Sequence, residues 1–214
     1  MYICLEGLKG CGKSTLLSTA QHFLTAQRVS FGTVAPTQAM PADRSWLERL
    51  STLVPCLRRH DAWNENLYAH RARYAAATAH WQRPLLLGDR SIVTSYATRW
   101  HKWKDPRRCI ARVDQLEAQL PAPDHVILLE VDPKVAWQRA IARRRTYGQH
   151  DEILPRLLEL RDTYQQIAGF GIPRLAATQW HVLDANQPAP ALFQDWLRLM
   201  RQLAPVSFSP LSLN

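Results

Sequence analysis

The sequence predicts an α/β fold in which a five-stranded parallel sheet is flanked by helices. Short apolar segments alternate with longer stretches of helical periodicity, and this alternation is typical of parallel sheets. A glycine-rich loop, residues 7–15, joins the first apolar segment to the first helix. The pair Asp89-Arg90 follows the third apolar segment, at the strand end where open α/β sheets bind ligands. We therefore expect one domain over residues 1–204, followed by a flexible tail at 205–214.

Five short apolar segments are the expected strands. Several are apolar on both sides, as strands covered on both faces of a parallel sheet should be. In chain order the expected strands are 2–5, 29–35, 84–88, 125–131 and 180–183.

Helical patterns fill the connections between these strands. Asp43 is expected to cap the helix that follows the second strand. A basic stretch at 99–108, RWHKWKDPRR, follows the helix that begins near Ser91. The expected helices begin at Lys13, after Asp43 and at about Ser91, and span 61–82, 134–144, 153–167 and 189–203.

The segment 7–15, GLKGCGKST, fits the phosphate-binding pattern GxxxxGKS. Three glycines permit positive φ angles and turn several N–H groups into one concavity: Gly7, Gly10 and Gly12. The Lys13 ammonium would reach the β- and γ-phosphates of a nucleoside triphosphate, and the Ser14 hydroxyl would bind Mg²⁺. The residues expected to bind ATP here are Gly7, Leu8, Lys9, Gly10, Cys11, Gly12, Lys13, Ser14 and Thr15.

Composition narrows the class of protein. The 214 residues carry a net charge of +9, and nearly all the cations are arginines, which suit phosphate or nucleic-acid ligands, although a coding bias toward arginine would give the same composition. Scattered cysteines without CxxC spacing argue against a zinc site or a disulfide framework. Because no apolar run approaches about 20 residues, we expect no membrane span and a cytoplasmic protein.

Two further clusters lie at predicted strand and helix ends. If the third strand neighbours the first, Asp89 and Arg90 lie beside the phosphate-binding loop. The helix 134–144 ends in an arginine cluster, and a polar segment with few anchoring side chains follows it. The cluster consists of Arg139, Arg143, Arg144 and Arg145. We expect a mobile lid at about 144–151 that brings arginines to the phosphates.

Four stretches, in one order along the chain, resemble the thymidylate kinase family. They are LEGLKGCGKSTLL, similar to the family's EGxDGxGKST; LYAHRARY, similar to LFxADRxxH; LLLGDRSIVTSYA, similar to DR(Y/F)xxSxxAYQ; and PDHVILLEVDPKVAWQRAIARR, similar to PDLTLYLDVDPEVGLxRAxxR. The resemblance covers roughly residues 2–203. It implies a P-loop kinase fold and an ATP- and Mg²⁺-dependent phosphoryl transfer to a small nucleotide acceptor.

The resemblance also implies roles for the matching residues on the acceptor side. Arg90 would hold the acceptor monophosphate. Asp89 would accept a hydrogen bond or lie near Mg²⁺ and the transferred phosphoryl group. Arg71, Thr94 and Arg99 would lie at the acceptor nucleoside.

On the donor side the resemblance implies that Arg139 and Arg143 reach the triphosphate, one near the adenine and one at the phosphates. Ala185, in the stretch VLDAN, would contribute to the ATP site. The residues expected to take part in catalysis are Lys9, Lys13, Asp89, Arg90 and Arg143.

This chain departs from the family pattern at the acceptor. Lys9 replaces an Asp near the acceptor sugar, Ser91 replaces an aromatic residue, and Arg99 stands where Gln or Thr would meet the thymine edge. The stretch APTQAMP replaces REPGGT. Phosphoryl transfer is thus a firmer prediction than thymidylate as the acceptor, and we expect dTMP or a related or modified pyrimidine deoxynucleotide.

Two other functions stay open from the sequence. Thr94 and Ser95 after DRS also resemble the ERS motif of deoxyribonucleoside kinases, although the EP dipeptide of that family is missing. Alternatively, the tryptophans and cations of 99–108 would bind DNA, in a P-loop kinase or binding protein that acts on a nucleobase or an end within DNA. The same tryptophans could instead pack on the domain. A second copy of the chain is a further partner left open.

Overall fold

A computed structural model gives the structure of the protein and describes residues 1–103, 105–143 and 152–204. Its strands form one parallel sheet in the order β2-β3-β1-β4-β5. They are β1 (Tyr2–Gly7), β2 (Phe31–Val34), β3 (Leu85–Asp89), β4 (His125–Glu130) and β5 (Gln179–Asp184). The predicted five-stranded parallel sheet is confirmed, and the α/β architecture is consistent with a P-loop kinase fold.

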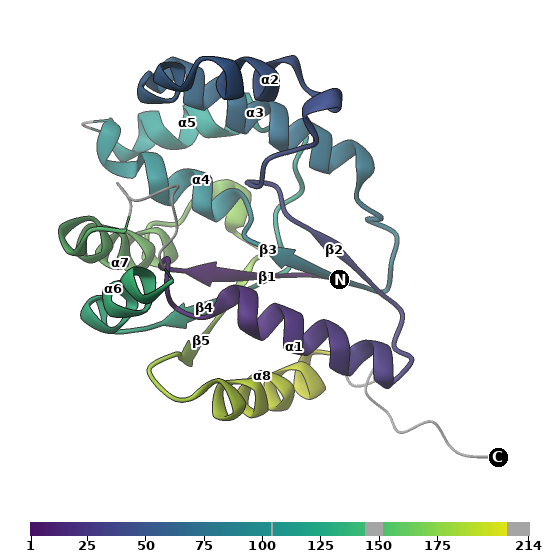
Figure 1. Cartoon of the computed structure of the whole chain (residues 1–214). Helices are drawn as coiled ribbons and strands as arrows, with labels where there is room; N and C mark the ends of the chain where they lie inside the picture. The colour runs from purple at the N-terminus through teal and green to yellow at the C-terminus, as the bar shows by residue number, and fades with distance from the viewer. Residues whose placement is uncertain (104, 144–151, 205–214) are drawn as a thin grey trace.

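Helices cover both faces of this sheet (Figure 1). The described α-helices are α1 (Lys13–Ala26), α2 (Trp46–Leu53), α3 (Asp61–Thr78), α4 (Ile92–Arg99), α5 (Pro106–Leu116), α6 (Pro133–Ala142), α7 (Leu154–Gly169) and α8 (Ala189–Leu203). Helices α1 and α8 pack together on one face, whereas α4 lies against α5 and α7 on the other. None of the helices in the described part of the chain is long and apolar enough to cross a membrane.

The central strand β1 places the glycine-rich loop in the middle of the sheet. All six of its residues are buried, as expected of a strand covered by helices on both faces. Leu5 pairs with Asp89 on one side, and Gly7 pairs with Leu129 on the other. The carboxyl ends of β3, β1 and β4 therefore meet at the loop, which is the edge where α/β sheets bind ligands.

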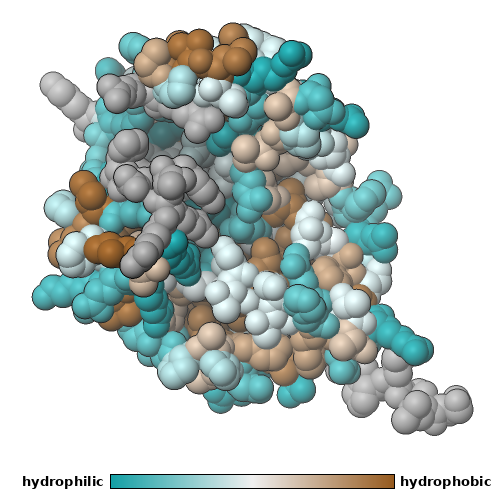
Figure 2. All heavy atoms as spheres, viewed as in Figure 1, coloured by the Kyte–Doolittle hydropathy of each residue, from teal (hydrophilic) through white to brown (hydrophobic). Residues whose placement is uncertain are grey.

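The outer face of α2 is apolar and exposed, in contrast to the buried central strand β1. Trp46 is 63% exposed and Leu53 is 76% exposed, and Leu50 and Val54 add to the same surface. Figure 2 shows apolar side chains gathered over α2 at the top of the molecule. A second copy of the chain as a partner stays a prediction, and the sequence analysis assigned it no surface.

Two local predictions were wrong. Ser45, rather than Asp43, caps α2: its side chain accepts a hydrogen bond from the Glu48 backbone N–H at 3.2 Å, while Asp43 lies in the short 3₁₀ helix η1 (Ala42–Arg44). The helix predicted over 61–82 ends at Thr78.

Helix α5 was not predicted at all, because its first turn lies in the basic stretch 99–108. Its start has an ordinary signal, since the Asp105 side chain accepts from the Arg107 N–H at 2.9 Å and Pro106 occupies the first helical position. The expected lid at 144–151, with Arg144 and Arg145, and the tail at 205–214 lie outside the described residues.

Candidate active site

The glycine-rich loop needs its glycines for two separate reasons. Gly7, Gly10 and Gly12 all have positive φ, between 89° and 131°. A Cβ added to Gly10 would lie 2.2 Å from the Ala136 carbonyl oxygen in α6. At Gly12, which caps α1, an added Cβ would meet nothing within 4 Å. The loop is thus packed against α6 on one side and open on the other, where a phosphate can approach its N–H groups.

Lys13 lies inside this loop, where it is 7% exposed. Its ammonium donates to the carbonyl oxygens of Gly7 at 2.7 Å and Leu8 at 2.8 Å, and contacts the Cys11 sulfur at 3.3 Å. Burial lowers the pKa of Lys13, and the charge of Arg90 lowers it further. Incoming phosphate oxygens would replace these weak acceptors with anionic ones.

A pocket of about 220 Å³ adjoins the loop. Seven of the residues that line it were predicted to lie at the ATP site: Gly10, Cys11, Gly12, Thr15, Arg139, Arg143 and Ala185. The Arg139 guanidinium donates to the Ala185 carbonyl at 2.8 Å and to the Asn186 carbonyl at 3.2 Å. Helix α6 and the loop after β5 are thereby tied together at the wall of the pocket.

Asp89 lies at the end of β3, next to β1, as its proposed role requires. Its carboxylate accepts a hydrogen bond from the Gln38 amide at 2.8 Å, a contact that the sequence did not predict. Ser14 is exposed in the first turn of α1. The Ser14 hydroxyl and the Asp89 carboxylate are oxygen donors of the kind that Mg²⁺ prefers, and Mg²⁺ commonly takes only one or two protein ligands besides phosphates and water. The residues present therefore fit the ion.

Arg90 adopts a backbone conformation that is unusual for a residue with a side chain. Its φ is +74°, and its N–H donates to the Leu5 carbonyl at 3.1 Å. Its guanidinium donates to the Thr94 hydroxyl at 3.0 Å and to the Tyr164 hydroxyl at 3.4 Å. Such strained residues cluster at functional sites, where the surrounding structure holds them in place.

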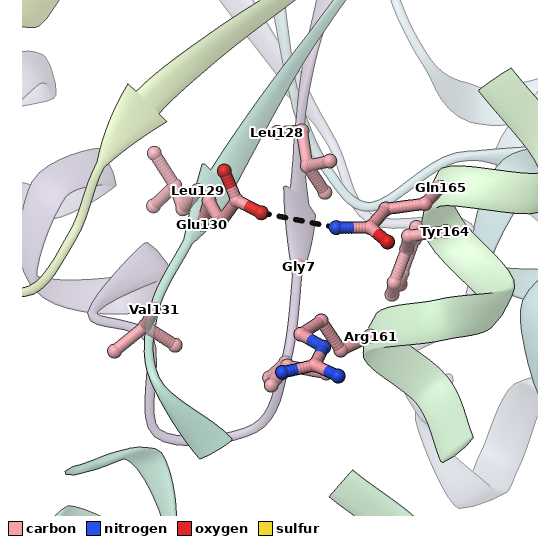
Figure 3. A pocket seen from close by; sticks show the side chains of 9 residues that line it. Gly7, Leu128, Leu129, Glu130, Val131, Arg161, Tyr164 and Gln165 are labelled. Carbon is pink, nitrogen blue, oxygen red and sulfur yellow. Dashed lines mark hydrogen bonds between the residues drawn. The ribbon is translucent and has the colours of Figure 1, made fainter. Parts of the chain in front are cut away.

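Three residues of this site were not singled out from the sequence: Glu6, Gln38 and Tyr164. Glu6 is completely buried at the end of β1 and accepts hydrogen bonds from α4 and α7. Figure 3 shows Tyr164 projecting from α7 toward the ends of β1 and β4, together with Arg161 and Gln165. A charged residue directly between the first apolar segment and the glycine-rich loop was the available signal for Glu6.

The residues predicted for the acceptor nucleoside are held by neighbouring groups. Arg71 donates to both carboxylate oxygens of Glu48, at 2.7 and 3.4 Å, and to the Thr37 carbonyl at 3.2 Å. Thr94 is 2% exposed and bonds Arg90, so it lies beneath that arginine.

Arg99 is 4% exposed and forms a buried ion pair with Glu117 at 2.9 Å. Its guanidinium carbon lies 4.9 Å from the centroid of the Tyr68 ring, which also contacts Arg71 at 5.6 Å. The Nη2 nitrogen of Arg99 is buried without a hydrogen-bond partner in the described structure. The Tyr68 ring thus brings the two predicted acceptor arginines together.

The remaining predicted residue of the loop, Lys9, is partly exposed. It lies between Leu8 and Gly10, on the loop that surrounds Lys13. Its ammonium therefore adds to the positive charge of the phosphate-binding region.

Both tryptophans of the basic stretch 99–108 pack on the domain. Trp100 is 2% exposed, its indole N–H donates to Gln166 at 2.9 Å, and its ring meets the Phe170 ring edge to face at 5.2 Å. Trp103 packs against the core. Lys102 pairs with Asp61. Trp100 is therefore not available to stack on a nucleic-acid base.

Several curated thymidylate kinases are similar to this chain over almost its whole length. The protein from Pseudoalteromonas translucida is 26% identical over 209 residues, which cover 94% of this chain and 95% of that protein. The protein from Thiobacillus denitrificans is 27% identical over 212 residues, covering 94% and 97%. The protein from Idiomarina loihiensis is 24% identical over 209 residues, covering 94% and 97%. No family model matches the chain.

Proposed function

We propose that this chain, which the comparisons support as a divergent member of the thymidylate kinase family, transfers the γ-phosphoryl group of ATP to a pyrimidine deoxynucleoside monophosphate. The chain is a nucleotide kinase, that is, a phosphotransferase. The acceptor class we propose is dTMP and related or modified pyrimidine deoxynucleotides, within which unmodified dTMP is a poor substrate. The cytoplasmic location expected for the protein stays a prediction.

The proximity of two cations from neighbouring strands carries this proposal. Lys13 follows β1 and Arg90 follows β3, and the two are close enough for the charge of Arg90 to lower the pKa of Lys13. Transfer between two phosphates requires both to be held at one place with their charge neutralised. Lys13 suits the donor phosphates and Arg90 suits the acceptor phosphate.

The donor half of the mechanism rests on the loop and the adjoining pocket. Loop N–H groups and the Lys13 ammonium would bind the β- and γ-phosphates, and Arg139 would border the adenine side. Arg143, exposed at the end of α6, and Lys9 would neutralise charge on the transferred group. Ser14 and Asp89 would hold Mg²⁺, which would supply neutralisation of the phosphate charge.

The residues predicted to bind the acceptor support a substrate other than unmodified dTMP. Arginine has only donors, so Arg99 cannot accept the N3–H of thymine as a Gln side chain can. Lys9 likewise offers a donor where a carboxylate would accept from the sugar hydroxyl. We therefore propose that dTMP is a poor acceptor.

Substitution of the two cations tests this function. Lys13→Ala should lower the rate of phosphoryl transfer by roughly a hundredfold to a thousandfold, as does loss of one preorganised donor elsewhere. Arg90→Ala should mainly raise the KM for the acceptor. Lys134→Ala, which removes an exposed lysine of α6, is the control and should leave activity unchanged. A Lys13→Ala enzyme within about twofold of the unmodified protein would contradict the proposal.

A further inference from the structure

Glu6 is a buried carboxylate that receives four hydrogen bonds. It is 0% exposed. One oxygen, Oε1, accepts from the Ser91 backbone N–H at 2.7 Å and from the Ser91 hydroxyl at 2.8 Å. The other, Oε2, accepts from the Thr94 hydroxyl at 2.6 Å and from the Tyr164 hydroxyl at 3.1 Å. No substrate can touch a group so enclosed, so any influence on the reaction passes through these partners.

Both sets of partners lead to Arg90. Ser91 directly follows Arg90, so the bond from its N–H holds the turn in which Arg90 has a φ of +74°. Within the described part of the chain, the side chains that accept from the Arg90 guanidinium are Thr94 and Tyr164. Glu6 therefore fixes the backbone of Arg90 through one oxygen and its side chain through the other.

The hydrogen bonds on the side-chain path all run in one direction. Arg90 donates to the hydroxyls of Thr94 and Tyr164, and each hydroxyl donates in turn to Glu6. Each hydroxyl oxygen can accept a hydrogen bond from Arg90 because its own hydrogen points to the Glu6 carboxylate. In such chains each bond polarises the next, and the buried anion compensates the charge of Arg90 at the far end.

We propose that Glu6 is a positioning residue that aims Arg90 at the acceptor phosphate, acting through Ser91, Thr94 and Tyr164. This inference rests on the proposed function. Glu6 lies directly before the ATP-binding loop, but Lys13 is held by carbonyls of the loop itself. Loss of Glu6 should therefore affect acceptor binding far more than ATP binding.

Glu6→Gln is the sharpest test because it preserves shape but not hydrogen-bonding pattern. If the amide nitrogen replaces Oε1, it faces the Ser91 backbone N–H, which cannot reverse. If the nitrogen replaces Oε2, the hydroxyls of Thr94 and Tyr164 lose the acceptor of their hydrogens and must turn them toward each other or toward Arg90, where both cannot be satisfied. Either orientation leaves a donor facing a donor in a buried site.

Two further variants complete the experiment. Tyr164→Phe keeps the buried ring but removes one hydroxyl between Arg90 and Glu6, and it serves if Glu6→Gln does not fold. Glu65→Gln is the matched control, because it alters a carboxylate that is only 9% exposed and pairs with Arg112, away from Arg90. KM for the acceptor, KM for ATP and melting temperature are measured for all three.

We expect Glu6→Gln to raise the acceptor KM at least about tenfold and Tyr164→Phe about threefold, with the ATP KM within about twofold of the original. Glu65→Gln should lower the melting temperature without moving either KM. An unchanged acceptor KM in Glu6→Gln or, if it does not fold, in Tyr164→Phe would overturn the inference. A parallel rise of both KM values would overturn it too, since it would show a purely structural role. If the unmodified protein phosphorylates no monophosphate, the proposed function itself fails, and this inference fails with it.

Discussion

Two alanine substitutions in the glycine-rich loop separate its packing from its phosphate binding. Both Gly10 and Gly12 have positive φ, which costs a residue with a side chain about 1 kcal/mol. They differ in surroundings, since a Cβ at Gly10 would lie 2.2 Å from the Ala136 carbonyl oxygen whereas one at Gly12 meets nothing within 4 Å. The Gly10 contact is about 1 Å shorter than an ordinary C···O contact of about 3.3 Å, so α6 or the loop must move.

The magnitudes follow from this difference. Gly12→Ala should cost about 1 kcal/mol of stability, or about 2–4 °C in melting temperature for a chain of this size. Gly10→Ala adds an overpacking cost of about 1–3 kcal/mol, so the total reaches about 4 kcal/mol and about 8–16 °C. It also displaces α6, which carries Arg139 and Arg143 at the nucleotide pocket.

Thermal melting without nucleotide and calorimetric titration with ATP measure the two effects separately. We expect Gly12→Ala to remain nearly as stable as the unmodified protein but to bind ATP weakly, because its methyl group fills the open side of the loop. Gly10→Ala should lose stability as well as ATP binding. Equal melting temperatures for the two variants would refute the packing argument, and unchanged ATP affinity in Gly12→Ala would refute the placement of the phosphates.

Other predictions concern the packed tryptophan and a histidine pair. Trp100→Ala should destabilise the fold by about 3–5 kcal/mol, because the ring is buried against Phe170. It should leave any salt-dependent binding of an oligonucleotide unchanged. Weaker DNA binding at an unchanged melting temperature would instead support the nucleic-acid-binding function. His125 on β4 and His181 on β5 face each other with ring nitrogens 3.1 Å apart, and burial lowers the pKa of both, with the charge of His125 lowering that of His181 further. In the unfolded chain both histidines have a pKa of about 6.5, so they take up protons there before they do so in the folded protein as the pH falls. The contribution of the neutral histidine pair to stability should therefore be complete above about pH 6.5 and should decline as the pH falls toward the lower folded-state pKa. His181→Gln should flatten the fall in melting temperature over that range, and an identical pH profile would contradict the assignment.

Local patterns were sufficient to predict most of the fold. The predicted helix 189–203 coincides with α8, because an amphipathic pattern after two prolines marks both its face and its start. The apolar segment before the glycine-rich loop correctly predicted β1, and the loop motif itself fixed the start of α1 at Lys13. These features depend on residues close together in the chain.

The partners of the charged site residues could not be predicted in this way. Glu6 is bonded by Ser91 and Tyr164, which lie 85 and 158 residues away in the sequence. Arg99 likewise pairs with Glu117, which caps the end of α5, a helix that the sequence analysis did not predict. Such contacts depend on how the helices pack over the sheet, and a local pattern carries no record of that arrangement.

Transfer of labelled phosphate from ATP to a panel of acceptors tests the central claim most directly. The panel contains deoxynucleosides, deoxynucleoside monophosphates including dTMP and pyrimidines modified at the base, and a short oligonucleotide. We predict that a pyrimidine monophosphate other than unmodified dTMP accepts the label with the highest kcat/KM. Phosphorylation of dTMP at ordinary kinase efficiency would contradict the altered acceptor site, labelling of nucleosides alone would point to a nucleoside kinase, and labelling of the oligonucleotide alone would contradict a monophosphate kinase altogether.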